Sequence, residues 1–249
     1  MYLIILIIVI IIIAFFYICI SKRKKYNKKA YVTMTTTPER IKDIWFYKNL
    51  KRTMSLKGNF KIILNVPYIS LKGEKYIIPD RVYKLKGDKF MINRCKDEGP
   101  ITKLLPTLRN PFIHDNSHII VVDDDIVYKK NIFHLINTGI HKHPSKIVTM
   151  CHSFIEGFKG FGFVKKTLKG LLNIKIPKIC IRIDDDVIST FVKHNKISIV
   201  ALPYDGYTHG FCSLKKNKTY THPKWDELRF DNREPMQELC IKELNKILT

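Results

Sequence analysis

The chain has 249 residues, of which 45% are hydrophobic and 27% charged, so it is not an intrinsically disordered protein and is long enough for one domain with its own core. It carries 44 Lys and Arg against 22 Asp and Glu, a formal net charge of +22. Six scattered cysteines are too few for a disulfide scaffold, and they form no CxxC pair, which argues against zinc and favours a reducing compartment.

Residues 1–20 are all apolar or aromatic, and the first charged residue is Lys22. A helix of about 20 residues spans the hydrocarbon core of a bilayer, and a secretory signal peptide would need a basic start and a cleavage site. We therefore expect a single-pass transmembrane helix at 1–20. The basic flank at 21–29 then places the following domain on the cytosolic side and attracts acidic membrane lipids.

Residues 30–249 are expected to form one α/β domain, because short β-branched runs alternate with helical patterns. The predicted strands are 30–34, 60–66, 81–85, 118–122, 146–151 and 198–202. The predicted helices are 40–50, 100–108, 131–138, 187–194 and 235–248. This alternation predicts a largely parallel sheet, which binds its ligands at the carboxyl ends of the strands.

Three consecutive carboxylates, Asp123, Asp124 and Asp125, follow the apolar run at 118–122. Adjacent carboxylates repel one another, so this cluster calls for a counter-cation. Mg²⁺ or Mn²⁺ prefers such oxygen ligands and bridges them to phosphates. The alternative is an acidic turn that caps a helix at Asn131.

The segment 121–128 resembles the D-x-D region of GT-A glycosyltransferases. Four further segments resemble motifs of that family in the expected order. They are the turn TTTPER at 35–40, the D-x-G-P-x-x-K segment at 97–103, a glycine-containing acceptor loop at 156–162, and an acidic pair that opens a late helix at 184–189. Together they cover about residues 30–205, whereas residues 206–249 match no motif.

The resemblance implies a Rossmann-like GT-A domain that transfers a sugar from a UDP- or GDP-linked donor to a hydroxyl of a glycan, lipid or protein. It implies donor contacts by Thr35, Thr36, Thr37, Arg40, Asp97, Lys103, Asp123 and Asp124. The metal, Mn²⁺ or Mg²⁺, would be held by Asp125 with Asp123 and a late histidine, His209 or His222. The acceptor would meet Glu156, Gly157, Phe158 and Gly160.

The late acidic pair would be Asp184 and Asp185, with Asp185 as the general base of an inverting reaction. A register shift of one residue would give that role to Asp186. Acidic residues at a helix start are also explained by capping and by the helix dipole. Arg40 and Lys103 have an equally simple alternative interpretation as surface cations.

Two other classes of function remain open at this stage. A metal-dependent nuclease or phosphotransferase would use the same carboxylates beside a basic surface. No nucleic-acid-binding motif is present, so no nucleic-acid partner is expected. A non-catalytic, basic membrane-surface protein would leave both acidic clusters unexplained.

Overall fold

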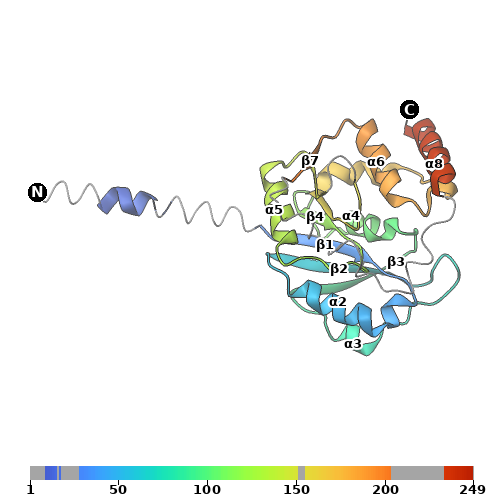
Figure 1. Cartoon of the computed structure of the whole chain (residues 1–249), viewed down its shortest axis with the longest axis horizontal. Helices are drawn as coiled ribbons and strands as arrows, with labels where there is room; N and C mark the ends of the chain where they lie inside the picture. Colours follow the sequence, from blue (N-terminus) through green and yellow to red (C-terminus); the bar gives the residue numbers. More distant parts are fainter. Residues whose placement is uncertain (1–8, 16, 18–27, 151–154, 203–232, 249) are drawn as a thin grey trace, which may run out of the picture.

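A computed structural model describes residues 9–15, 17, 28–150, 155–202 and 233–248 (Figure 1). In the apolar N-terminal stretch, residues 9–15 are helical, which corresponds to roughly 10 Å of helix rise. Among the described residues, no helix combines the length and the apolarity needed to cross a bilayer. The predicted single-pass span is therefore wrong, and the cytosolic orientation derived from it falls with it. The remainder of that predicted span, 1–8, 16 and 18–20, lies outside the described residues.

The domain is built on a seven-stranded sheet with the order β3-β2-β1-β4-β6-β5-β7. Its strands are β1 (Ala30–Thr35), β2 (Phe60–Pro67), β3 (Phe90–Cys95), β4 (His118–Val121), β5 (Ile147–Thr149), β6 (Phe161–Val164) and β7 (Ile199–Ala201). Only β6 runs against its neighbours β4 and β5, and the other pairings are parallel. The predicted mostly parallel α/β sheet is confirmed.

Helices cover both faces of this sheet (Figure 1). They are α2 (Ile44–Met54), α3 (Asp80–Tyr83), α4 (Leu105–Arg109), α5 (Ile132–Lys142), α6 (Asp184–His194) and α8 (Arg233–Leu248). Because successive strand residues point to opposite faces, Ile62 of β2 packs into the core under α2, α3 and α5, whereas Ile63 packs with α4, α6 and α8. Short 3-10 helices, η1 (Arg40–Lys42), η2 (Ile101–Lys103), η3 (Lys165–Asn173) and η4 (Lys178–Cys180), complete the layers.

One predicted strand, 81–85, is wrong, because Pro79 precedes a helical turn there and the edge strand is β3 instead. Strand β6 was not predicted, since Gly162 interrupts its short apolar run. The predicted helix at 40–50 divides into η1 and α2 at Asp43, whose carboxylate accepts the Trp45 N–H at 2.8 Å and caps α2.

The structure contains a disulfide that the spacing of the cysteines did not predict. Cys180 and Cys240 are joined by a disulfide, and both are buried between η4, α6 and α8. The expectation of reduced cysteines is wrong for this pair, because its members lie 60 residues apart in sequence and meet only in the fold. Cys95 is free, whereas Cys151 and Cys212 lie outside the described residues.

The order of the strands places a crevice at one edge of the sheet. From β1 the chain continues to β2 on one side, whereas β4 lies on the other side of β1. The topological switch point therefore lies between β1 and β4. In open α/β sheets ligands bind beyond the carboxyl ends of the strands at such a point. Thr35 ends β1 there, and Asp123 follows β4 two residues after Val121.

Candidate functional site

A cleft of about 1880 Å³ lies at this edge of the sheet. It is lined by the loops that follow β1, β2, β3 and β4, by the loop before β6, and by one side each of α6 and α8. Pockets for a single small ligand usually enclose about 300–1,000 Å³, so this cleft has room for two substrates.

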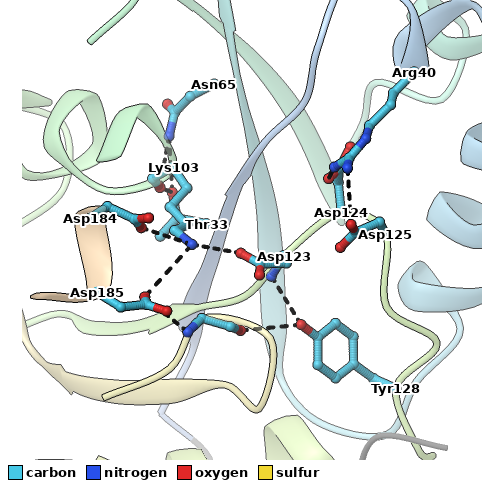
Figure 2. A network of polar contacts seen from close by, with 11 residues as sticks. Thr33, Arg40, Asn65, Lys103, Asp123, Asp124, Asp125, Tyr128, Asp184 and Asp185 are labelled. Atoms are coloured by element: carbon cyan, nitrogen blue, oxygen red, sulfur yellow. Dashed lines mark hydrogen bonds and ion pairs between the residues drawn. The ribbon is translucent and has the colours of Figure 1, made fainter. Parts of the chain in front are cut away.

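The first charged group in the cleft is the Arg40 cluster, which consists of Arg40, Asp124 and Asp125 (Figure 2). Arg40 Nη1 lies 2.8 Å from Asp124 Oδ1, and Nη2 lies 3.0 Å from Asp125 Oδ2. The two carboxylate side chains are only 5% and 3% exposed, against 22% for Arg40. Burial acts to lower the pKa of Arg40, but both carboxylates outweigh it and raise that pKa.

Helix α2 supports the loop that carries Asp124 and Asp125. Asn49, a buried residue of α2, donates from Nδ2 to the carbonyl oxygens of Asp124 and Ile126, each at 3.0 Å. Burial raises the pKa of Asp124, while Arg40 opposes that rise. The Arg40 cluster is therefore a charge-paired group built into the base of the cleft.

The second charged group is the Lys103 cluster, which consists of Lys103, Asp123, Asp184 and Asp185 (Figure 2). Lys103 Nζ lies 2.6 Å from Asp123 Oδ1, 2.9 Å from Asp184 Oδ2 and 4.0 Å from Asp185 Oδ1. Burial acts to lower the pKa of Lys103, but the three carboxylates raise it well above its usual value. One buried ammonium thus joins the two acidic segments of the sequence.

The main chain of Lys103 is fixed by a buried polar network beneath the cleft. Its carbonyl oxygen accepts from Thr33 Oγ1 of β1 and, at 3.1 Å, from Asn65 Nδ2 of β2. Asn65 also reaches Thr107 Oγ1 of α4 at 3.1 Å, and Asn93 of β3 donates to Asn65 Oδ1 at 2.8 Å. Three neighbouring strands therefore determine where the ammonium lies.

Gly157 completes the Lys103 cluster from the loop before β6. Its N–H donates to Asp185 Oδ1 at 3.2 Å, and its carbonyl accepts from the Tyr128 hydroxyl at 3.3 Å. The same hydroxyl accepts the Asp123 N–H at 2.9 Å. A Cβ on Gly157 would clash with Lys103 Nζ and would lie 2.8 Å from Asp123 Oδ1, so glycine is needed for this close approach.

Asp185 differs from the other members of the Lys103 cluster. Its side chain is 36% exposed to the cleft, and burial raises its pKa to about 7, with Asp184 and Asp123 adding to the rise and Lys103 opposing it. A carboxylate with a pKa near neutrality accepts a proton more readily than an ordinary aspartate does. Asp185 therefore combines exposure to the cleft with a pKa near neutrality.

The remaining predicted donor residues lie around the cleft, and several are engaged in holding its loops. Thr35 Oγ1 donates to Asn65 O at 2.9 Å, and Thr37 Oγ1 accepts the Arg40 N–H at 3.2 Å. Asp97 accepts the Leu71 N–H at 2.8 Å and the Gly99 N–H at 2.9 Å, so its carboxylate ties two loops together.

The predicted acceptor loop reaches the cleft through two side chains. Glu156 and Phe158 line it, and Lys159 pairs with Glu156 at 2.8 Å. Gly160 adopts a φ of 84° in the turn that leads into β6, and it shapes the loop rather than lining the cleft. His209 and His222 lie outside the described residues.

The charges of the two clusters suit a divalent cation. Five carboxylates face two cations, which leaves an excess of negative charge, and carboxylate oxygens are the ligands that Mg²⁺ and Mn²⁺ prefer. Within the described part of the chain, no three acidic, histidine or cysteine side chains converge as a metal cage. Lys103 and Arg40 lie between the carboxylates instead.

Sequence reasoning missed several residues of the site. Asn65 carried a usable signal, because it is a polar residue inside an otherwise apolar strand. Tyr128 lies close to the acidic cluster in the sequence, but no pattern there indicates its role. No pattern indicates the role of Tyr76 either, which donates to Thr36 O at 3.0 Å. The contribution of α8 to the cleft was also unexpected.

Comparison with known proteins identifies the fold only through structure. No protein-family model matches the chain, and no curated protein sequence matches it significantly. The mannosyltransferase PcManGT of Pyrobaculum calidifontis, solved with GDP-Man and Mn²⁺, is similar with a TM-score of 0.51 and 10% identity. The similarity covers 71% of this chain but only 55% of that protein.

A cytidylyltransferase of Leptospira borgpetersenii is similar at the same level, with a TM-score of 0.51 and 16% identity. That similarity covers 72% of this chain and 76% of the other. At these identities the comparisons show the fold alone. They confirm a GT-A-like, Rossmann-like architecture, which is shared by sugar transferases and nucleotidyltransferases.

Proposed function

We propose that the chain is a glycosyltransferase that moves a sugar from a UDP- or GDP-linked donor to a hydroxyl of an acceptor, with inversion and with Asp185 as the general base. The observation that carries the proposal is Asp185 itself. It faces a cleft at the switch point of a GT-A-like sheet, its pKa is raised to about 7, and the Gly157 N–H orients it.

The donor half of the cleft lies between β1 and β4. Arg40 presents a partly exposed guanidinium to this half, and a guanidinium matches the oxygens of a diphosphate with paired N–H donors. Thr35, Thr36 and Thr37 line the adjacent wall, where Asp97 holds the loop that faces the nucleoside.

The carboxylates of the donor half fit a divalent ion by their charge and their ligand type. Asp123 and Asp125 would hold Mn²⁺ or Mg²⁺ there, with Asp124 beside them. When bound, the ion offsets the negative charge that develops on the diphosphate leaving group.

In the transfer step, the acceptor hydroxyl gives its proton to the Asp185 carboxylate. Its oxygen forms a bond to the anomeric carbon from the face opposite the leaving group. The bond between that carbon and the diphosphate oxygen breaks, and its electron pair leaves with the nucleoside diphosphate. One direct displacement of this kind inverts the configuration of the sugar.

Lys103 and Asp184 prepare Asp185 for this role. Asp184 pairs with Lys103 at 2.9 Å, so the ammonium compensates Asp184 and Asp123 before it reaches Asp185 at 4.0 Å. Asp185 is therefore the carboxylate of this cluster that the ammonium stabilises least. Glu156 and Phe158 on the opposite loop would contact the incoming acceptor.

The experiment uses the full chain with UDP-glucose, UDP-N-acetylglucosamine and GDP-mannose, each with Mn²⁺ or Mg²⁺, and measures release of nucleoside diphosphate. Asp185→Asn should lower kcat by about 10²–10⁴-fold, because the amide cannot accept the proton. Asp186→Asn is the matched control for register and should cost less than tenfold.

Two results would contradict the proposal. A folded protein that neither binds nor cleaves any of the nucleotide sugars is not this enzyme. The cytidylyltransferase-like fold makes the second test specific: release of pyrophosphate from CTP and a sugar phosphate, without activity on nucleotide sugars, would indicate nucleotidyl transfer instead.

A further inference from the structure

The C-terminal helix α8 presents two parallel stripes of side chains. Cys240 and Leu244 are 0% and 1% exposed and pack into the core with α6, and Leu248 continues the same stripe. Gln237, Ile241 and Asn245 are spaced by four residues and line the cleft. Residues four apart share one face of a helix, so the cleft-facing stripe is about 12 Å long at 1.5 Å per residue.

The position of α8 is fixed relative to the candidate base. The disulfide joins Cys240 to Cys180, which lies four residues before Asp184. Gln237 Nε2 also donates to Asp186 Oδ2 at 3.1 Å, directly beside Asp185. Figure 1 shows α8 alongside α6, and both helices contribute residues to the lining of the cleft.

The chemistry of the stripe is amide, aliphatic, amide. A primary amide has two donors and an acceptor oxygen, and the bond to Asp186 uses one donor of Gln237. Ile241, 37% exposed, adds an apolar surface between the two amides. A sugar matches both kinds of side chain, because its hydroxyls donate and accept hydrogen bonds with the amides while its C–H faces are apolar and pack on the isoleucine. A lipid tail would not use the amides.

We propose that Gln237, Ile241 and Asn245 form the acceptor subsite and that the acceptor is a saccharide. This inference rests on the proposed glycosyl transfer and deepens it. The saccharide lies along α8 with one hydroxyl directed at Asp185, and the disulfide fastens α8 to the segment that leads into Asp184. Transfer to the saccharide depends on α8, whereas donor cleavage by water does not.

The test separates these two activities in the full chain. Donor hydrolysis is measured as release of UDP or GDP without acceptor, and transfer is measured with a panel of p-nitrophenyl glycosides. The triple variant Gln237→Ala/Ile241→Ala/Asn245→Ala should raise the acceptor KM or lower transfer by at least about tenfold. Its hydrolysis rate and its Kd for the nucleoside diphosphate should stay within about twofold of the parent.

Two further variants define the mechanism of the effect. Glu238→Ala/Lys242→Ala changes exposed residues of α8 outside the cleft lining and should leave transfer unchanged. Cys180→Ser/Cys240→Ser removes the bond that fastens α8 and should reproduce the loss of transfer with hydrolysis retained. Treatment of the parent with dithiothreitol should have the same effect, and reoxidation should reverse it.

The outcomes are distinguishable from failure of the proposed function. If the parent cleaves no donor, the glycosyltransferase proposal fails. If the parent cleaves donor but transfers to no saccharide, or only to a lipid or peptide hydroxyl, the saccharide subsite is wrong. It is equally wrong if the triple variant loses hydrolysis and transfer in parallel, or loses neither.

Discussion

The Arg40 cluster and the Lys103 cluster each pair one cation with aspartates, but with opposite exposure. In the Arg40 cluster the carboxylates are 5% and 3% exposed and the cation is 22% exposed. In the Lys103 cluster the cation is 5% exposed, and the carboxylates of Asp123 and Asp185 are 24% and 36% exposed. The Arg40 cluster therefore exposes its cation to the cleft, whereas the Lys103 cluster exposes two of its carboxylates.

Because different charges are exposed, we expect the two clusters to have different roles. A partly exposed guanidinium can donate paired N–H hydrogen bonds to the oxygens of a diphosphate. Carboxylates spread over a buried ammonium stay close together in spite of their mutual repulsion, and one of them retains a raised pKa. The variants below test each half of this comparison.

The largest effect is expected for Lys103→Met. It leaves the carboxylates of Asp123 and Asp184 without their buried partner, so the free energy of unfolding should fall by about 3–5 kcal/mol at neutral pH. Urea denaturation measures it. Adding Asp184→Asn should restore part of the loss, and a double variant as unstable as the single one would show that charge pairing is not the cause.

Gly157→Ala should come next, because the added methyl group meets Lys103 Nζ and Asp123 Oδ1. Overpacking of this kind costs about 1–3 kcal/mol, and kcat should fall because the N–H that orients Asp185 is displaced. Gly87→Ala is the matched control, since a Cβ at Gly87 has no heavy atom within 4 Å. Equal effects of the two variants would argue against the close approach.

Arg40→Lys keeps the positive charge but loses the two-pronged contact with Asp124 and Asp125. We expect the Kd for UDP or GDP to rise about tenfold, with the pH dependence of transfer unchanged. Isothermal titration with the nucleoside diphosphate measures the Kd, and initial rates across a pH series measure the pH dependence of transfer. A shifted pH profile with unchanged Kd would reverse the roles of the clusters.

The smallest effect is the pH dependence of the parent. Because the base must be ionised, kcat/KM should rise with pH and reach half of its plateau near the Asp185 pKa of about 7. The folded pKa lies above the ordinary value of 3.8, so protonation of Asp185 favours the folded state. Its stabilising contribution is present below about pH 4 and is lost as the pH rises through 7. Asp185→Asn should flatten both profiles.

The sequence predicted the position of the site better than the partners within it. Carboxylates that follow buried strands must lie at the sheet edge, so Asp123, Asp124 and Asp125 were found from the apolar run before them. Arg40 and Lys103 were recognised but assigned to phosphates. Their carboxylate partners lie up to 85 residues away, as Arg40 and Asp125 do, and only the assembled sheet brings them together.

The helices, α8 included, were predicted more reliably than the edge strand β3, but the contribution of α8 to the cleft was not predicted. Strand β3 pairs on one side only and carries Asn93 and Arg94, so its pattern lacks the apolar run of the central strands. The stripe at Cys240 and Leu244 marks α8 as amphipathic, but no local pattern tells which neighbouring stripe borders a cleft. No local sequence pattern reveals the disulfide that joins this helix to Cys180 either, because the two cysteines lie 60 residues apart.

The hydrogen bonds that converge on the Lys103 carbonyl have a consequence for how the site comes into being. Thr33 and Asn65 belong to the neighbouring strands β1 and β2, so the ammonium takes its place only when those two strands have paired in register. The segment cannot open locally without breaking buried polar contacts of the sheet. The geometry of the candidate site is thus a product of the cooperative folding of the domain, and it is formed before any ligand binds.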